Sequence, residues 1–137
     1  MTTIATPLRE YKSLARAVKC TTSISGLQVA SVLDGHEVIA ACKNSQGTGH
    51  TVNDDEVWAA QKRLALEEGI FCEPAGAVAL AGALRAVREK RIDPAKVFVC
   101  LVTGSAFKDP PSLDRMIVDA LCPTIDVTQM EAQVPVV

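Results

Sequence analysis

The residue pair Thr103-Gly104 is the clearest place in the sequence where a ligand could be held. It follows Val97–Val102, an unbroken apolar run typical of a strand that is buried on both faces of a parallel sheet. Open α/β sheets bind ligands just beyond the carboxyl ends of their strands. The Thr103 hydroxyl could hydrogen-bond such a ligand, and Gly104 would let the backbone approach it closely. The alternative is an ordinary turn after a core strand.

Glu73 is a second candidate because its carboxylate stands where a helix is expected to begin. Pro74 suits the first turn of a helix, and the apolar spacing predicts that the helix runs to about Lys90. Residues Ala75–Ala83 are nearly all small, so this part of the helix could approach a sheet or a ligand closely. A carboxylate is favourable at a helix N-terminus for electrostatic reasons alone, and that structural role is sufficient to explain Glu73.

Two segments together resemble the threonine synthases, which are pyridoxal-phosphate (PLP) enzymes of fold type II. Thr103–Pro110 resembles their Thr-Gly-x-Gly-Leu-Lys-Asp-Pro signature, with Ala106 and Phe107 in place of the usual glycine and leucine. Glu67–Gly82 resembles a second family block that contains a Glu-Pro pair. The two blocks stand in the family's order and at its spacing. The similarity is clear over Val52–Pro110 and weaker before it.

The resemblance implies cofactor-binding roles for Thr103, Gly104 and Glu73. In the family, a hydroxyl at the position of Thr103 faces the pyridine nitrogen of PLP, and the glutamate of the Glu-Pro pair lies close to the ring. A hydroxyl can donate a hydrogen bond to a neutral ring nitrogen but cannot hold a pyridinium as an aspartate could. The cofactor is then a weaker electron sink, which favours elimination and replacement. The full enzymes convert O-phosphohomoserine and water to threonine and phosphate.

Two parts of such an enzyme are missing from the sequence. The lysine that forms the internal Schiff base lies, in fold type II, in a segment resembling Ser-x-Lys-x-Arg, and no lysine here has that context. The phosphate needs a cradle of backbone amides at a helix N-terminus. Gln46–Gly49 is the only candidate, and its composition favours a turn. We therefore expect the C-terminal region of a threonine synthase-like enzyme, with no catalytic residue assigned, inactive and without PLP when alone.

Two other functions stay open at this point. The chain could be a non-catalytic α/β remnant that acts in assembly or binding. It could also belong to a threonine dehydratase-like lyase, although those relatives usually end the later strand in Ser-Gly-Gly-Asn. An incomplete sheet would leave apolar surfaces uncovered. We therefore expect the partner to be a second copy of the chain, in a homo-oligomer, or a complementary N-terminal segment.

The predicted fold class is α/β: a partial three-layer sheet flanked by helices, resembling the C-terminal part of the large domain of fold type II PLP enzymes. We expect a single, incomplete enzyme domain over residues 1–137. Its predicted parts are an amphipathic helix (1–19, apolar spacing from Pro7), a family-like core (52–110) and a C-terminal extension (111–137).

Local signals predict where the other elements begin and end. Asp34 and Asn53, each followed three residues later by glutamate, are typical of residues that precede a helix. Gly69 is a suitable helix stop. Short strands are expected at residues 50–52 and 70–72, and a last helix at Leu113–Leu121.

Composition bears on which classes of partner the chain binds and on the cellular compartment in which it resides. The net charge of −2 gives no reason to seek nucleic acid or an anionic membrane, and no apolar run approaches the ~20 residues that span a bilayer. Apolar residues make up 48% of the chain, which permits a real core. We predict free thiols in the cytoplasm and no metal site, because the cysteines are odd in number and lack metal-ligand spacing: Cys20, Cys42, Cys72, Cys100 and Cys122.

Overall fold

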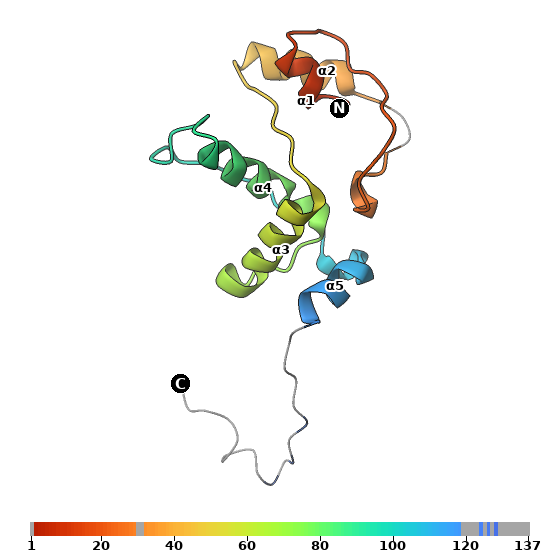
Figure 1. Ribbon diagram of the computed structural model, residues 1–137, viewed down its shortest axis with the longest axis vertical. Helices are drawn as coiled ribbons and strands as arrows, with labels where there is room; N and C mark the ends of the chain where they lie inside the picture. The colour runs from red at the N-terminus through yellow and green to blue at the C-terminus, as the bar shows by residue number, and fades with distance from the viewer. Residues whose placement is uncertain (1, 30–31, 119–123, 125, 127, 129–137) are drawn as a thin grey trace.

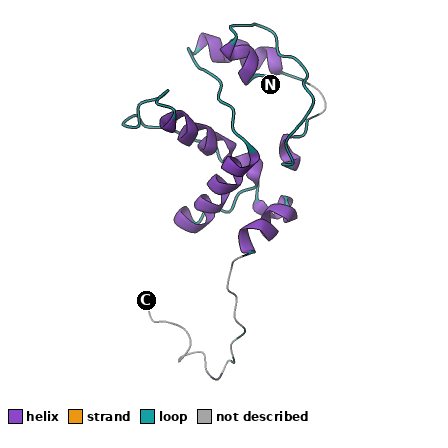
Figure 2. Ribbon diagram, in the orientation of Figure 1, coloured by secondary structure: helices purple, strands orange, loops and turns teal. Residues whose placement is uncertain are grey.

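The computed structural model describes residues 2–29, 32–118, 124, 126 and 128, and there the chain consists of helices and loops (Figures 1 and 2). Helices α1 and α2 lie together at one end of the molecule, and α3 and α4 pack against each other in its middle (Figure 1). The elements are α1 (Ala5–Arg9), the 3-10 turn η1 (Ser25–Leu27), α2 (Gly35–Asn44), α3 (Asp54–Glu68), α4 (Pro74–Arg88), the 3-10 turn η2 (Ala106–Lys108) and α5 (Pro110–Ile117).

The predicted α/β class is wrong, because the described residues contain no sheet. Their only strand-like pairing is one antiparallel bridge between Cys72 and Ser105. Val97–Val102, the expected core strand, runs as a loop whose backbone has no backbone partner within the described ranges. A strand is stabilised by its neighbours, and no other described segment offers it an edge. Its alternate side chains are exposed to 93, 88 and 78% (Val97, Val99 and Leu101).

The predicted helix over residues 7–19 is also wrong, since α1 ends at Arg9. Tyr11 has a left-handed backbone (φ +57°), and the Lys12 N–H donates to the carbonyl of Pro7 at 2.9 Å, which closes the helix end. Tyr11 and Leu14 are exposed, so beyond Leu8 the apolar stripe of the expected helix is largely uncovered within the described residues. Short helices without a packed face are marginal in water.

The helices with strong end signals form as predicted. The Asn53 side chain accepts from the Glu56 N–H at 2.8 Å, and the Glu56 carboxylate accepts from the Asn53 N–H at 3.0 Å. Gly69 ends α3 in the left-handed region, with φ +67°. Pro74 begins α4, which ends at Arg88, two residues earlier than expected.

Two other helices differ in detail from the prediction. Helix α2 forms after Asp34, although that side chain accepts no capping hydrogen bond. Helix α5 begins at Pro110, three residues before the predicted start, and residues 119–121 of the prediction lie outside the described residues. The segments expected as short strands are loops, apart from the bridge at Cys72.

The core lies between α3 and α4 and fixes where α4 begins. Buried Gln61 donates through Nε2 to the carbonyl of Cys72 at 2.9 Å and to Ser112 Oγ at 3.1 Å, which ties α5 to α3. The buried apolar cluster comprises Ile24, Val57, Ala60, Leu64, Cys72, Ala77 and Ala81. Because this cluster packs α3 against α4, it fixes the position of the residues at the start of α4 relative to α3.

The cysteines in the described residues are free thiols: Cys20, Cys42, Cys72 and Cys100; Cys122 lies outside them. Burial raises the pKa of the Cys72 thiol, as expected for a small core residue. Within the described ranges, no group of three His, Cys, Asp or Glu side chains could hold a metal, and no helix is long and apolar enough to cross a membrane.

Candidate functional site

The structure brings Glu73, Thr103 and Gly104 together at the start of α4. The Glu73 N–H donates to the carbonyl of Gly104 at 3.2 Å, and the Ala106 N–H donates to the carbonyl of Phe71 at 3.3 Å. These bonds flank the Cys72–Ser105 bridge. Together they hold residues 104–106, which follow the apolar segment Val97–Val102, against residues 71–73, which precede α4. The Thr103 backbone therefore lies against α4 at Gly76, but the residue is in an exposed loop, so its predicted place at the end of a central strand is wrong.

Two glycines, Gly76 and Gly104, allow this close approach, and a third, Gly26, lies at its border. A Cβ on Gly76 would lie 1.9 Å from the carbonyl oxygen of Thr103, so only glycine lets the loop backbone touch α4 here. Gly104 has φ +65°, and a Cβ on it would lie 1.9 Å from Glu73 Oε1. A Cβ on Gly26 would lie 4.0 Å from Glu73 Oε2, so the carboxylate lies between Gly104 and η1. The small residues of α4 predicted such an approach, but neither Gly76 nor Gly26 was identified from the sequence.

The polar side chains of this site are free to serve a ligand. Glu73 is half-buried and Thr103 is exposed, and neither side chain has a hydrogen bond or an ion pair within the described part of the chain. The Glu73 carboxylate can accept hydrogen bonds, and the Thr103 hydroxyl can donate or accept one. The site can therefore bind and orient a polar ligand.

The Gln46–Gly49 segment does not suit a phosphate group. It follows the C-terminal end of α2, where the Gln46 and Gly47 N–H groups donate to the carbonyls of Lys43 and Cys42. A helix C-terminus presents carbonyls and negative potential, which is the wrong polarity for an anion. The prediction of a turn is confirmed. The described residues thus place polar groups at the start of α4, but the Gln46–Gly49 segment offers no cradle for a phosphate.

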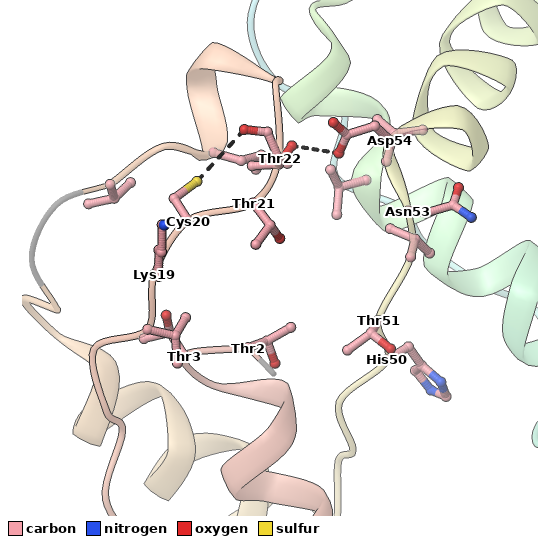
Figure 3. Close-up of a pocket in the computed structure, with 16 residues that line it drawn as sticks. Thr2, Thr3, Lys19, Cys20, Thr21, Thr22, His50, Thr51, Asn53 and Asp54 are labelled. Carbon is pink, nitrogen blue, oxygen red and sulfur yellow. Dashed lines mark hydrogen bonds between the residues drawn. The ribbon is translucent and has the colours of Figure 1, made fainter.

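A separate cavity of about 590 Å³ lies between the N-terminal part of the chain and the start of α3 (Figure 3). Figure 3 shows Lys19–Thr22 on one side and His50–Asp54 on the other. Glu73, Thr103 and Gly104 do not line it. This cavity was not predicted, because the segments that form it share no motif. Its polar lining includes the side chains of Thr2, Thr3, Lys19, Thr21, Thr22, His50 and Thr51.

Asp54 holds one end of this cavity together. Its carboxylate accepts from the Thr22 hydroxyl at 2.6 Å, from the Ser23 N–H at 2.7 Å and from the Ser23 hydroxyl at 2.9 Å. Burial raises the pKa of Asp54, but these hydrogen bonds outweigh that effect and the net pKa is lower than usual. The ionised carboxylate therefore joins the N-terminal segment to the first turn of α3.

Comparison with known proteins agrees with the motifs. The family model of the pyridoxal-phosphate dependent enzymes matches residues 3–104, which include all three site residues and extend further toward the N-terminus than the motifs indicated. Threonine synthase of Synechocystis sp. is 35% identical over 65% of this chain and 23% of its own length. Threonine synthase of Methanocaldococcus jannaschii is 35% identical over 69% of this chain and 23% of its own length. That of Mycobacterium leprae is 31% identical over 73% of this chain and 30% of its own length.

The chain thus spans about a quarter of the length of the first two of these relatives. The family match covers well over half of the chain and contains both motif blocks up to Gly104. The two threonine synthases named first match 65 and 69% of the chain. This chain belongs to the pyridoxal-phosphate dependent enzyme family.

Proposed function

We propose that this chain supplies the C-terminal part of a threonine synthase-like lyase, which converts O-phosphohomoserine and water to threonine and phosphate. The observation that carries the proposal is the contact between the two motif blocks at the start of α4, where Gly76 touches the backbone of Thr103 and Glu73 touches Gly104. Relatives that are 35% identical to about two thirds of the chain are named threonine synthases. The reaction needs an electron sink at the substrate's α carbon, which PLP supplies when it is bound.

The chain's own contribution is to position the ring of that cofactor. Thr103 offers a hydroxyl that can donate to a ring nitrogen, and Glu73 offers a carboxylate beside it. The close contact at Gly76 fixes the loop that carries the hydroxyl. Because the phosphate cradle and the Schiff-base lysine are not provided, we propose that PLP binding and turnover need the remaining part of the enzyme, on the same or another polypeptide.

A specific observation favours a second function in assembly. The exposed apolar segment Val97–Val102 has open backbone groups on both edges and lies directly before Thr103. Such a segment pairs readily with another strand. With this function the chain binds a complementary segment or a second copy of itself, and its motif residues have no role in binding a cofactor.

The test is a chimera that joins the upstream three quarters of a threonine synthase relative to this chain. We expect phosphate release from O-phosphohomoserine by the chimera and none above a PLP-only control by the chain alone, because only the chimera has the lysine and the phosphate cradle. A folded chimera that binds PLP but releases no phosphate would favour the assembly function. If it deaminates threonine instead, the dehydratase-like alternative holds.

In the same chimera, we expect Thr103→Asp to shift the visible absorption band of bound PLP. An aspartate stabilises a protonated ring nitrogen, whereas the hydroxyl does not. Thr103→Ser, which keeps the hydroxyl, is the matched control and should leave the band in place. An unchanged band in a folded Thr103→Asp chimera would show that residue 103 does not face the ring.

A further inference from the structure

A second, smaller cavity lies at the opposite end of α4 from Glu73. Its volume is about 120 Å³, and three parts of the chain meet there: the end of α1, the loop before α3, and the C-terminal end of α4 with the turn after it. The 15 residues of α4 span about 20 Å at ~1.5 Å per residue, so this cavity is distinct from the site at Glu73. Its lining residues are Arg9, His50, Thr51, Arg85, Glu89 and Arg91.

The cavity carries an excess of positive charge. Three guanidinium groups and one carboxylate line it, which leaves a net charge of +2 when His50 is neutral. Arg85 contacts Glu89 at 2.8 Å and Glu56 at 3.1 Å, and Arg91 contacts Glu89 at 2.8 Å. Arg9 has no ion pair or hydrogen bond within the described residues. Its charge is therefore the least compensated in the cavity.

The lining also presents donors rather than acceptors. The one carboxylate, Glu89, has both oxygens engaged, Oε1 by Arg85 and Oε2 by Arg91. The guanidinium groups have further N–H donors, and Thr51 and His50 add a hydroxyl and an imidazole. Glu56, which pairs with Arg85, is itself held by Arg88 and by the Asn53 N–H. No unengaged carboxylate lines the cavity to compete for the arginines.

The imidazole of His50 lies within the field of these charges. Burial lowers its pKa, and the charges of Arg91 and Arg9 lower it further, while Glu89 acts in the opposite direction. Arg85 and Thr51 also line the cavity beside it. The imidazole is thus neutral at pH 7 and stands in a positive potential that comes from two separate elements, α1 and the turn after α4.

We propose that this cavity binds a single tetrahedral oxyanion, either inorganic phosphate or the phosphate group of a phosphomonoester. Planar guanidinium groups bind such oxygens in pairs. The volume of about 120 Å³ equals only a few water molecules at ~30 Å³ each and is well below the ~300–1,000 Å³ of a cofactor pocket. The anion would neutralise Arg9 and brace α1 against the end of α4.

The experiment is an NMR pH titration of the two histidines of the full chain, with sulfate as the probe because it stays a dianion throughout. Chloride at equal ionic strength is the reference. We expect sulfate to raise the pKa of His50 by about 0.5–1, because a nearby anion stabilises imidazolium. His36, which does not line the cavity, should not move. Equal shifts of both histidines, or none, would overturn the proposal.

Variants then assign the effect to the cavity. Arg9→Gln should abolish the His50 response, and Arg63→Gln, which removes the same charge from the exposed face of α3, should not. Glu89→Gln should strengthen binding severalfold, since it removes the only carboxylate, and misfolding would not produce that gain. Unchanged sulfate binding in folded Arg9→Gln would refute the site. Repeating the titration with inorganic phosphate and with glycerol 3-phosphate separates the free ion from a phosphomonoester.

Discussion

Gly76→Ala is expected to cause a large loss of stability in this chain. The added Cβ would lie 1.9 Å from the carbonyl oxygen of Thr103, and 3.0 Å from its carbonyl carbon and its amide nitrogen. These are backbone atoms, so the overlap cannot be relieved by a side-chain rotation. Such overpacking typically costs about 1–3 kcal/mol or more. We expect a decrease of about 3 kcal/mol in the free energy of unfolding, measured by urea denaturation.

Gly82→Ala is the matched control in the same helix. Its added Cβ would meet only the Cβ of His50 at 3.9 Å, an ordinary contact. Alanine is favoured over glycine inside a helix by about 0.8–1 kcal/mol, so this variant should be slightly more stable than the parent. If Gly76→Ala also proves neutral or stabilising, the loop that carries Thr103 is not seated on α4, and the arrangement on which the proposed cofactor role rests is wrong.

The sequence was informative where a single residue type determines the outcome locally. The Asn53–Glu56 capping pair, the left-handed Gly69 and Pro74 at the start of α4 each act through neighbours in the chain, and all three appear in the structure. The two motif blocks also meet at that helix start, through the backbone hydrogen bond between Glu73 and Gly104, although Thr103 lies in an exposed loop and not at the end of the predicted strand.

The predictions failed where an element needs a partner distant in sequence. Val97–Val102 has the composition of a buried strand, yet the described residues provide no second strand to complete its hydrogen bonds. The stripe of residues 7–19 fails for a similar reason, since nothing covers Tyr11 and Leu14. The arginine-lined cavity lay beyond prediction because Arg9 and Arg91, which line it together, come from α1 and from the turn after α4 and share no motif.

Val99→Lys is expected to weaken self-association of the chain strongly, because Val99 lies in the exposed apolar segment Val97–Val102. We expect the isolated chain to self-associate through Val97–Val102, since burying these side chains against a second copy removes them from water and pairs their backbone groups. Val99 is 88% exposed, so the folded chain loses no packing when it is replaced. Each copy would lose roughly 1.5–3 kcal/mol of side-chain burial and gain a charge to desolvate.

That loss predicts a dimerisation constant at least about tenfold weaker, because about 1.4 kcal/mol corresponds to a factor of ten. Sedimentation velocity over a range of concentrations measures it. Leu66→Lys, which places the same charge on an exposed apolar residue of α3, is the control and should associate like the parent. A parent chain that stays monomeric at high concentration would contradict the prediction. Equal weakening by both variants would contradict a contact that is specific to Val97–Val102.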